Sequence, residues 1–270
     1  MIKAIFCDLD GTLLRDDMTL SRENAEAIAE LARRGIVFIP TTGRAYFEIP
    51  LSVREHSDIR YYICSNGAAT YDMQTRESYH RSIPSDKMRK IRELLSNMSV
   101  FNVIHSTDGN SYFDKSKSSF DIMKNYRMSD YYCGYFEKNS IPTDNLEERL
   151  SEGGVNMLAS FFSYEDERER MAAELSRIGV GYTNSAYAQL EIFDEKSGKG
   201  QAVLDFIGRC DLSPEEILTV GDSKNDISMF SVTSNSLAVS GAVPALKEKA
   251  AHIGCSNEEH IAKYILENLI

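Results

Sequence analysis

Two acidic clusters near opposite ends of the chain carry the residue types best suited to chemistry. The first is Asp8-Leu9-Asp10-Gly11-Thr12, which follows a short apolar run at residues 2–7. The second is Gly221-Asp222-Ser223-Lys224-Asn225-Asp226, which follows an apolar run at residues 217–220. Carboxylates gathered at the ends of apolar strands repel one another unless a cation holds them, and oxygen-rich sites suit Mg²⁺. The two clusters therefore predict one shared magnesium site and chemistry on phosphate.

Each cluster needs a strand to position it, and a third polar segment follows another predicted strand. Residues 36–39 form a short apolar run that leads into Thr41-Thr42-Gly43-Arg44. A helix capped by Ser21 and ended by Gly35 separates this run from the first one, an order typical of a parallel βαβ unit. Ligands of open parallel sheets bind beyond the carboxyl ends of the strands. We therefore expect the three polar segments to meet in one crevice.

The pattern of predicted helices and strands differs between about residue 84 and residue 188 from that in the rest of the chain. Amphipathic helical stretches at 86–98 and 164–178 alternate there with strands rich in aromatic and β-branched residues. The pattern predicts an α/β protein with a parallel-sheet core, residues 1–83 and 189–270, and an inserted α+β cap, residues 84–188. Before the insertion, Ser65-Asn66-Gly67-Ala68 follows a third apolar strand and is interpreted as a turn, because Asn-Gly is a strong turn signal.

Composition and charge narrow the class of protein. The chain has 270 residues, of which 42% are hydrophobic and 26% charged, as is usual for a globular protein with a sizeable core. Its formal net charge is −11 and it has no Lys/Arg-rich stripe, which argues against nucleic-acid binding. The five scattered cysteines lack metal-ligand spacing, and no apolar stretch approaches membrane-spanning length. We expect a cytoplasmic protein that binds neither nucleic acid nor membrane.

Asp8 and Asp10 lie two residues apart at the end of a predicted strand, so their side chains are expected on the same side. Two such carboxylates can divide the work, one as nucleophile and the other as proton donor. Taken alone, the Asp-x-Asp pattern favours a purely structural role, in which one Asp caps a helix and the other closes a turn. Two interpretations of Thr42 are also equally favoured when it is taken alone. Its hydroxyl and the Gly43 N–H can hold a phosphate oxygen, or Thr42 can be the N-cap of a helix. The convergence of three strand ends favours the functional interpretation.

A lysine is predicted to supply the positive charge that a phosphate needs. Lys199 stands at a helix start, which is electrostatically unfavourable unless its ammonium faces a negative partner. The alternative is a solvated surface lysine, and Lys196 and Lys224 compete for the functional role. Lys199 is preferred because Gly200 lets a neighbouring backbone come close.

The second acidic cluster offers three side chains with separate roles. Asp222 is placed to ligate the metal, Asn225 to donate to phosphate, and Asp226 to orient Lys199 or a metal-bound water. The alternative is a capped helix with an acidic first turn, which the Gly-Asp-x-x-x-Asp pattern after an apolar strand disfavours.

Together these segments resemble the four motifs of the haloacid dehalogenase (HAD) superfamily. The matching residues are Asp8-Leu9-Asp10-Gly11-Thr12, Thr42-Gly43-Arg44, Lys199-Gly200 and residues 221–226. Their order and spacing are similar to those of the Cof-type (subfamily IIB) phosphatases, which carry a large C2B-type α/β cap between the second and third motifs. The resemblance covers the whole chain and implies a Rossmann-like core.

The resemblance also implies roles for individual residues. Asp8 would be the nucleophile that forms an aspartyl-phosphate, and Asp10 would protonate the leaving oxygen and then activate the hydrolytic water. Mg²⁺ would be held by Asp8, by the backbone carbonyl of Asp10 and by Asp222. The transferring phosphoryl group would be steadied by Thr42, Lys199 and Asn225.

The sequence thus predicts a Mg²⁺-dependent phosphatase of small phosphorylated metabolites, with sugar phosphates as expected substrates. Two alternatives stay open: a phosphomutase or phosphotransferase, and a regulatory protein that binds a phosphometabolite without turnover. The inserted domain is expected to act as a lid. Several side chains could contact a substrate there, but each is interpreted as an exposed charge or a core aromatic: Arg81, Lys115, Lys117, Tyr182 and Tyr187.

Overall fold

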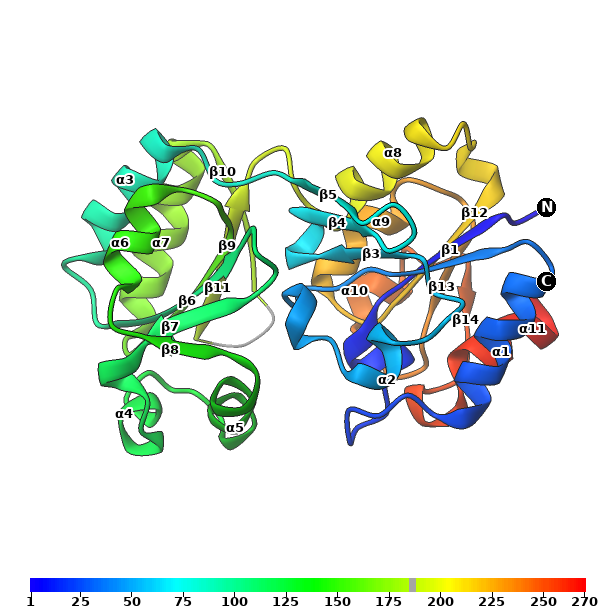
Figure 1. Ribbon diagram of the computed structural model, residues 1–270, viewed down its shortest axis with the longest axis horizontal. Helices are drawn as coiled ribbons and strands as arrows, with labels where there is room; N and C mark the ends of the chain where they lie inside the picture. The colour runs from blue at the N-terminus through cyan, green and yellow to red at the C-terminus, as the bar shows by residue number, and fades with distance from the viewer. Residues whose placement is uncertain (185–187) are drawn as a thin grey trace. The chain divides into compact units, whose positions relative to one another are not determined.

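The computed structural model describes residues 1–184 and 188–270, and the chain divides into two compact units. The first, called the core below, comprises Met1–Arg44, Ile49–Tyr79 and Gly198–Ile270. The second, called the cap, comprises Ala45–Glu48 and His80–Ser197. Figure 1 labels the elements of both units along the chain. In the part of the chain described, no helix is both long and apolar enough to cross a membrane.

The core is built on a parallel sheet with the strand order β14-β13-β12-β1-β2. Its strands are β1 (Ala4–Cys7), β2 (Val37–Pro40), β12 (Ile217–Gly221), β13 (Ser236–Ala238) and β14 (His252–Ile253). β1 lies between β12 and β2 and is buried along its whole length, as expected of an apolar strand covered on both faces. The second, antiparallel sheet holds β3 (Tyr61–Cys64), β4 (Ala69–Asp72) and β5 (Glu77–His80), and a parallel bridge from Thr41 to Ile63 joins the two.

Helices of the core pack in pairs, α1 against α11 and α8 against α9 (Figure 1). The core helices are α1 (Arg22–Arg33), α2 (Leu51–Arg54), α8 (Lys199–Arg209), α9 (Ile227–Phe230), α10 (Pro244–Lys247) and α11 (Ile261–Asn268). The predicted cap of α1 is confirmed, because the Ser21 hydroxyl accepts a hydrogen bond from the Asn24 N–H. On α8, Phe206 meets Phe6 of β1 edge to face, with ring centroids 5.4 Å apart. This contact packs α8 against β1.

The cap has a mixed sheet of its own with the strand order β10-β11-β9-β6-β7-β8. Its strands are β6 (Val100–Ser106), β7 (Ser111–Asp114), β8 (Ile141–Thr143), β9 (Val155–Phe162), β10 (Val180–Thr183) and β11 (Gln189–Asp194). All neighbours pair antiparallel except β7 and β8. Hydrophobic clusters cover both faces of this sheet, one with α3 (Ser85–Leu95), α6 (Leu146–Glu152) and α7 (Glu165–Ile178), the other with α4 (Phe120–Lys124) and α5 (Asp130–Asn139). The predicted α/β fold with an inserted cap is confirmed.

The cap takes in more of the chain than the sequence predicts. Residues 189–197, predicted to belong to the core, lie in the cap because β11 pairs with both β9 and β10. Residues 80–83, also predicted to belong to the core, lie in the cap as well. Residues Ala45–Glu48 are a further part of the cap, where the Phe47 N–H donates to the Gly109 carbonyl at 3.0 Å. The buried Glu48 carboxylate accepts from the Ser111 hydroxyl there at 2.5 Å. A short segment directly after the second polar motif is thus anchored in the cap.

Candidate active site

The carboxyl ends of β1, β2 and β12 bring the three polar segments to one edge of the core sheet. Cys7 at the end of β1 is in register with Val220 of β12 and with Pro40 of β2. The Asp8 N–H donates to the Val220 carbonyl at 2.9 Å, and the Thr41 N–H donates to the Cys7 carbonyl at 2.8 Å. The three segments therefore leave the sheet side by side.

A tight turn at residues 9–13 places the first acidic segment against the second. Gly11 has a φ of +73°, a conformation that residues with a Cβ resist. A Cβ on Gly11 would lie 2.7 Å from Asp222 Oδ2, so only glycine leaves room for this carboxylate. The Thr12 hydroxyl donates to the other oxygen of Asp222 at 3.4 Å. The turn after β1 therefore holds the Asp222 side chain from two directions.

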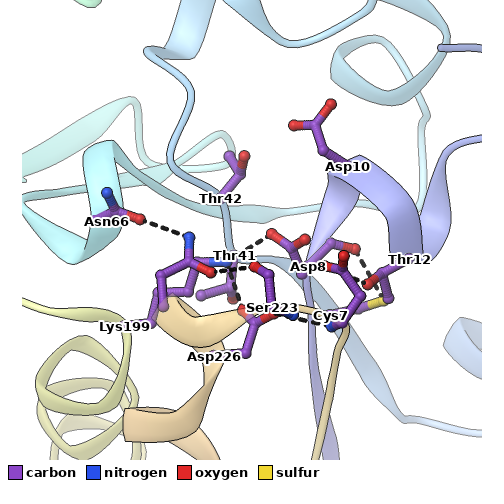
Figure 2. A network of polar contacts seen from close by, with 12 residues as sticks. Cys7, Asp8, Asp10, Thr12, Thr41, Thr42, Asn66, Lys199, Ser223 and Asp226 are labelled. Carbon is purple, nitrogen blue, oxygen red and sulfur yellow. Dashed lines mark hydrogen bonds and ion pairs between the residues drawn. The ribbon is translucent and has the colours of Figure 1, made fainter. Parts of the chain in front are cut away.

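Lys199 joins the two acidic segments. Its ammonium lies 2.6 Å from Asp8 Oδ1 and 2.6 Å from Asp226 Oδ1, and its side chain is fully buried (Figure 2). The competing residues Lys196 and Lys224 are both exposed. Burial alone lowers the pKa of Lys199, but the charges of Asp226 and Asp8 outweigh it, so its pKa is raised and the ammonium stays charged.

Asp226 is fully buried and supports the loop that carries Asp222. Its Oδ2 accepts from the backbone N–H groups of Asp222 and Ser223 at 2.9 and 3.0 Å, while Oδ1 accepts from Lys199. The same carboxylate completes a capping box with the Ser223 side chain. Asp226 thus fixes the loop that carries Asp222 and also contacts Lys199. The contact with Lys199 fits one of the two roles predicted for Asp226, the orientation of this lysine.

Three carboxylates crowd this small region. Asp8, Asp222 and Asp226 each offer an oxygen within 4.8 Å of the others. Burial raises the pKa of Asp8 well above its ordinary range; Lys199 opposes that rise, and the charges of Asp226 and Asp222 add to it. Burial and the charge of Asp226 likewise raise the pKa of Asp222 to about 6. The protein therefore holds these acids at an electrostatic cost.

A hard divalent cation fits this donor set. The available ligands are carboxylate oxygens, which Mg²⁺ prefers, and imidazole and thiolate donors are absent from the acidic group found in the described residues. Asp226 already accepts three hydrogen bonds, so Asp8 and Asp222 are better suited to hold a cation. Gly11 lies against the Asp222 carboxylate, so the backbone of the neighbouring residue Asp10 also lies near this carboxylate.

The side chain of Asp10 does not join the carboxylate cluster. It points away from Asp8 (Figure 2). It pairs instead with Arg44, whose Nε and Nη2 lie 2.8 and 2.6 Å from the two carboxylate oxygens. The sequence predicts both aspartates on the same side of a strand, but the strand ends at Cys7 and the turn begins at once, so strand alternation does not extend to Asp10. The Arg44 side chain is 7% exposed and that of Asp10 is 40% exposed, so this bidentate pair is buried on the arginine side and open to solvent on the aspartate side.

The predicted phosphate-holding residues lie around the cluster. Thr42 is buried, and its hydroxyl accepts from the Arg44 N–H at 3.1 Å, which closes a turn and not a helix. Asn225 accepts from the Ser223 hydroxyl at 2.6 Å through Oδ1 and donates through Nδ2 to Asn66 Oδ1 at 3.1 Å. Asn66 and Arg44 were not among the predicted site residues. The only signals for them were the Asn-Gly turn and the arginine that follows Thr-Gly.

The three charged cap side chains considered from the sequence have partners within the cap. The Arg81 guanidinium donates to the Lys196 carbonyl, Lys115 pairs with Asp144 at 3.1 Å, and Lys117 donates to the Val100 carbonyl at 2.8 Å. Tyr182 is 40% exposed on β10. Tyr187 lies outside the described residues.

Comparison with known proteins agrees with this geometry. A family model described as haloacid dehalogenase-like hydrolase matches residues 5–265. The chain is 29% identical to 5-amino-6-(5-phospho-D-ribitylamino)uracil phosphatase YwtE of Bacillus subtilis, over 100% of this chain and 98% of that protein. Among solved structures, a haloacid dehalogenase-like hydrolase from B. subtilis superimposes with a TM-score of 0.83 at 24% identity, over 100% of both chains. A HAD subclass IIB sugar phosphatase superimposes with a TM-score of 0.82 at 22% identity, over 98% of both chains.

The family model spans nearly the whole chain, and the chain carries the acidic segments, the buried lysine and the inserted cap in the predicted order. The chain therefore belongs to the haloacid dehalogenase-like hydrolase family, as a Cof-type phosphatase that hydrolyses phosphoric monoesters.

Proposed function

We propose that this protein is a Mg²⁺-dependent phosphatase that hydrolyses small phosphorylated metabolites, sugar phosphates among them, through a phosphorylated aspartate at position 8. The observation that carries the proposal is the buried Lys199 ammonium held 2.6 Å from both Asp8 and Asp226. A lysine fixed there turns one oxygen of Asp8 toward itself and leaves the other oxygen for attack. Asp222 stands beside Asp8 as the second carboxylate for a cation.

The reaction divides into two transfers of the phosphoryl group. In the first, an oxygen of Asp8 attacks phosphorus, the bond to the ester oxygen breaks, and Asp10 gives that oxygen a proton. In the second, water attacks phosphorus, Asp10 takes a proton from the water, and the acyl-phosphate bond opens to release phosphate. Asp10 can act only after its carboxyl turns away from Arg44, because the bidentate pair occupies both of its oxygens.

Charge explains why a cation belongs in the site. Three carboxylates and one ammonium leave an excess of two negative charges where a phosphate dianion must arrive. Mg²⁺, when bound, supplies charge neutralisation and fixes the orientation of the phosphoryl oxygens. Asp8 and Asp222 would hold it with their carboxylates, and Asp10 would contribute its backbone carbonyl.

The substrate class is supported by the names of relatives. One relative is named as a phosphatase of a phosphorylated ribitylamino-uracil and one structural neighbour as a sugar phosphatase. Both names describe a phosphate ester on a polyhydroxylated carbon chain. We therefore expect phosphorylated sugars and sugar alcohols to rank above aromatic or nucleotide esters in kcat/KM.

A panel of phosphorylated metabolites, assayed with Mg²⁺ for released inorganic phosphate, tests this function. Replacing Asp8 by Asn should reduce turnover below detection, and acid-quenched protein should carry phosphate in the wild type but not in D8N. Asp121→Asn, at an exposed position in the cap, is the matched control and should keep wild-type turnover. Ordinary activity in D8N would refute the nucleophile assignment. A phosphorylated isomer as product would point to a mutase, and tight binding without turnover to a regulator.

A further inference from the structure

The turn after β3 has an unusual backbone. Ser65, Asn66 and Gly67 have φ angles of +50°, +52° and +89°, so two consecutive residues with a Cβ adopt the left-handed region. Such residues resist this conformation, and it persists only where the surrounding structure requires it. Ser65 and Asn66 are both almost completely buried, at 2% and 1% exposure. A buried, strained turn beside an active site calls for a physical reason beyond joining two strands.

This turn is bonded to the segment that carries Thr42. The Asn66 N–H donates to the Thr42 carbonyl at 3.0 Å, and the Ser65 N–H donates to the Arg44 carbonyl at 2.9 Å. The Asn66 side-chain amide also packs against Gly43, because a Cβ on Gly43 would lie 3.3 Å from Asn66 Oδ1. The turn thus sets the path of the backbone from Thr42 to Arg44.

The same turn touches the segment that carries the buried lysine. A Cβ on Gly67 would lie 2.4 Å from the carbonyl oxygen of Gly198, the residue directly before Lys199. Only a glycine can approach that carbonyl so closely. The start of α8, and with it Lys199, is therefore packed against the turn.

Asn66 also reaches the last polar segment through its side chain. Its Oδ1 accepts from Asn225 Nδ2 at 3.1 Å, while Asn225 Oδ1 accepts from the Ser223 hydroxyl at 2.6 Å (Figure 2). A side-chain amide is planar and carries two N–H donors. With its oxygen held by Ser223 and one N–H held by Asn66, the direction of the second N–H of Asn225 is determined.

We propose that Asn66 is a positioning residue of the active site, which aims the second N–H of Asn225 at the phosphoryl group. This inference rests on the proposed function, since it assigns Asn225 to the phosphate. The turn joins the three segments that carry Thr42, Lys199 and Asn225, which are distant in sequence. If Asn stood here only because it tolerates the left-handed conformation, glycine would serve equally well.

Replacement of Asn66 by Gly separates these two explanations, because glycine keeps the backbone conformation and removes only the amide. Loss of one neutral hydrogen bond that orients a donor should lower kcat/KM by about tenfold. Asp211→Gly is the matched control, since Asp211 is exposed and has a φ of +53°. D211G should keep the wild-type kcat/KM. Its change in stability measures the effect of placing glycine at a left-handed position, without the loss of a side-chain hydrogen bond.

A double-mutant cycle with Asn225→Ala distinguishes positioning from a general structural effect. If Asn66 acts through Asn225, then N66G should cause no further loss of kcat/KM in the N225A background. Losses that multiply in the double variant, or an N66G variant with wild-type kcat/KM, would overturn the inference.

A crystal structure of N66G tests the geometry without any assay. The Asn225 amide should leave its wild-type orientation, and an unchanged orientation would refute the positioning role. Absence of phosphatase activity in the wild type would refute the proposed function. Full activity in N225A would refute the phosphate role of Asn225. In either case, the crystal structure of N66G would still decide whether Asn66 orients Asn225.

Discussion

Replacing Asp222 by Asn should stabilise the metal-free protein and remove its response to Mg²⁺. Burial and the charge of Asp226 raise the pKa of Asp222 from its ordinary value of 3.8 to about 6. Between these two values the folded protein holds a proton that the unfolded chain has released. The free energy of unfolding of the metal-free protein therefore falls as pH rises from about 4 to about 6, and stays lower above pH 6. Asn removes this loss and still accepts from Thr12.

The pKa difference sets the size of the effect. A shift of about 2 units corresponds to at most about 3 kcal/mol at pH 8. Asp222 is partly accessible to solvent, which screens part of this cost, so we expect the variant to gain about 1 to 2 kcal/mol. For a domain of this size, that gain corresponds to a rise in Tm of about 2 to 8 °C.

Thermal unfolding at pH 5 and pH 8, with EDTA and with Mg²⁺, measures both parts of the prediction. The wild type should gain Tm on adding Mg²⁺, by an amount equivalent to about 2.7 kcal/mol at a concentration of 100 times Kd, and the variant should not. Glu267→Gln on the exposed face of α11 is the matched control and should behave as the wild type. A lower Tm for metal-free D222N at pH 8, or an undiminished response to Mg²⁺, would refute the reasoning.

Two other substitutions test the same region. Lys199→Met leaves two buried carboxylates without their cation, so it should reduce the free energy of unfolding by about 3 to 5 kcal/mol in urea titrations, and unchanged stability would contradict the ion-pair geometry. Gly11→Ala puts a Cβ 2.7 Å from Asp222 Oδ2 and should weaken Mg²⁺ binding measured by calorimetry. Gly35→Ala, with a similar φ and open space around its Cβ, should leave that binding unchanged.

The sequence predicts the parts of the site that depend on strand ends. Short apolar runs followed by Asp8, by Thr42 and by Asp222 are local patterns, and parallel pairing of β1 with β2 and β12 is enough to bring them together. Lys199 is predicted from a local conflict, a cation at a helix start, which its two aspartate partners resolve. Each of these inferences needs only the direction of the neighbouring backbone.

Other features depend on contacts that no local pattern encodes. Asn66 and Asn225 meet across 159 residues of sequence, so the Asn-Gly pair predicts the turn but not its partner. The orientation of Asp10 depends on where the strand ladder ends and on the reach of Arg44. The sequence predicts too short a cap for a similar reason, because β11 is an apolar strand whose sheet is decided by its pairing with β9 and β10.

The arrangement of charges also fixes an order of events. Arg44 and Asp10 form a neutral pair at the side of the site, so they neither attract nor repel a phosphate as a unit. With all three carboxylates ionised, the remaining groups carry two excess negative charges, and the Lys199 ammonium already pairs with Asp8 and Asp226. A phosphate dianion approaching without a cation therefore meets net repulsion in a region of reduced solvent. A divalent cation held by Asp8 and Asp222, as proposed above, would cancel this excess, and the second N–H of Asn225 and the Thr42 segment would then act on the phosphate at short range. We therefore expect the cation to bind before the substrate or together with it.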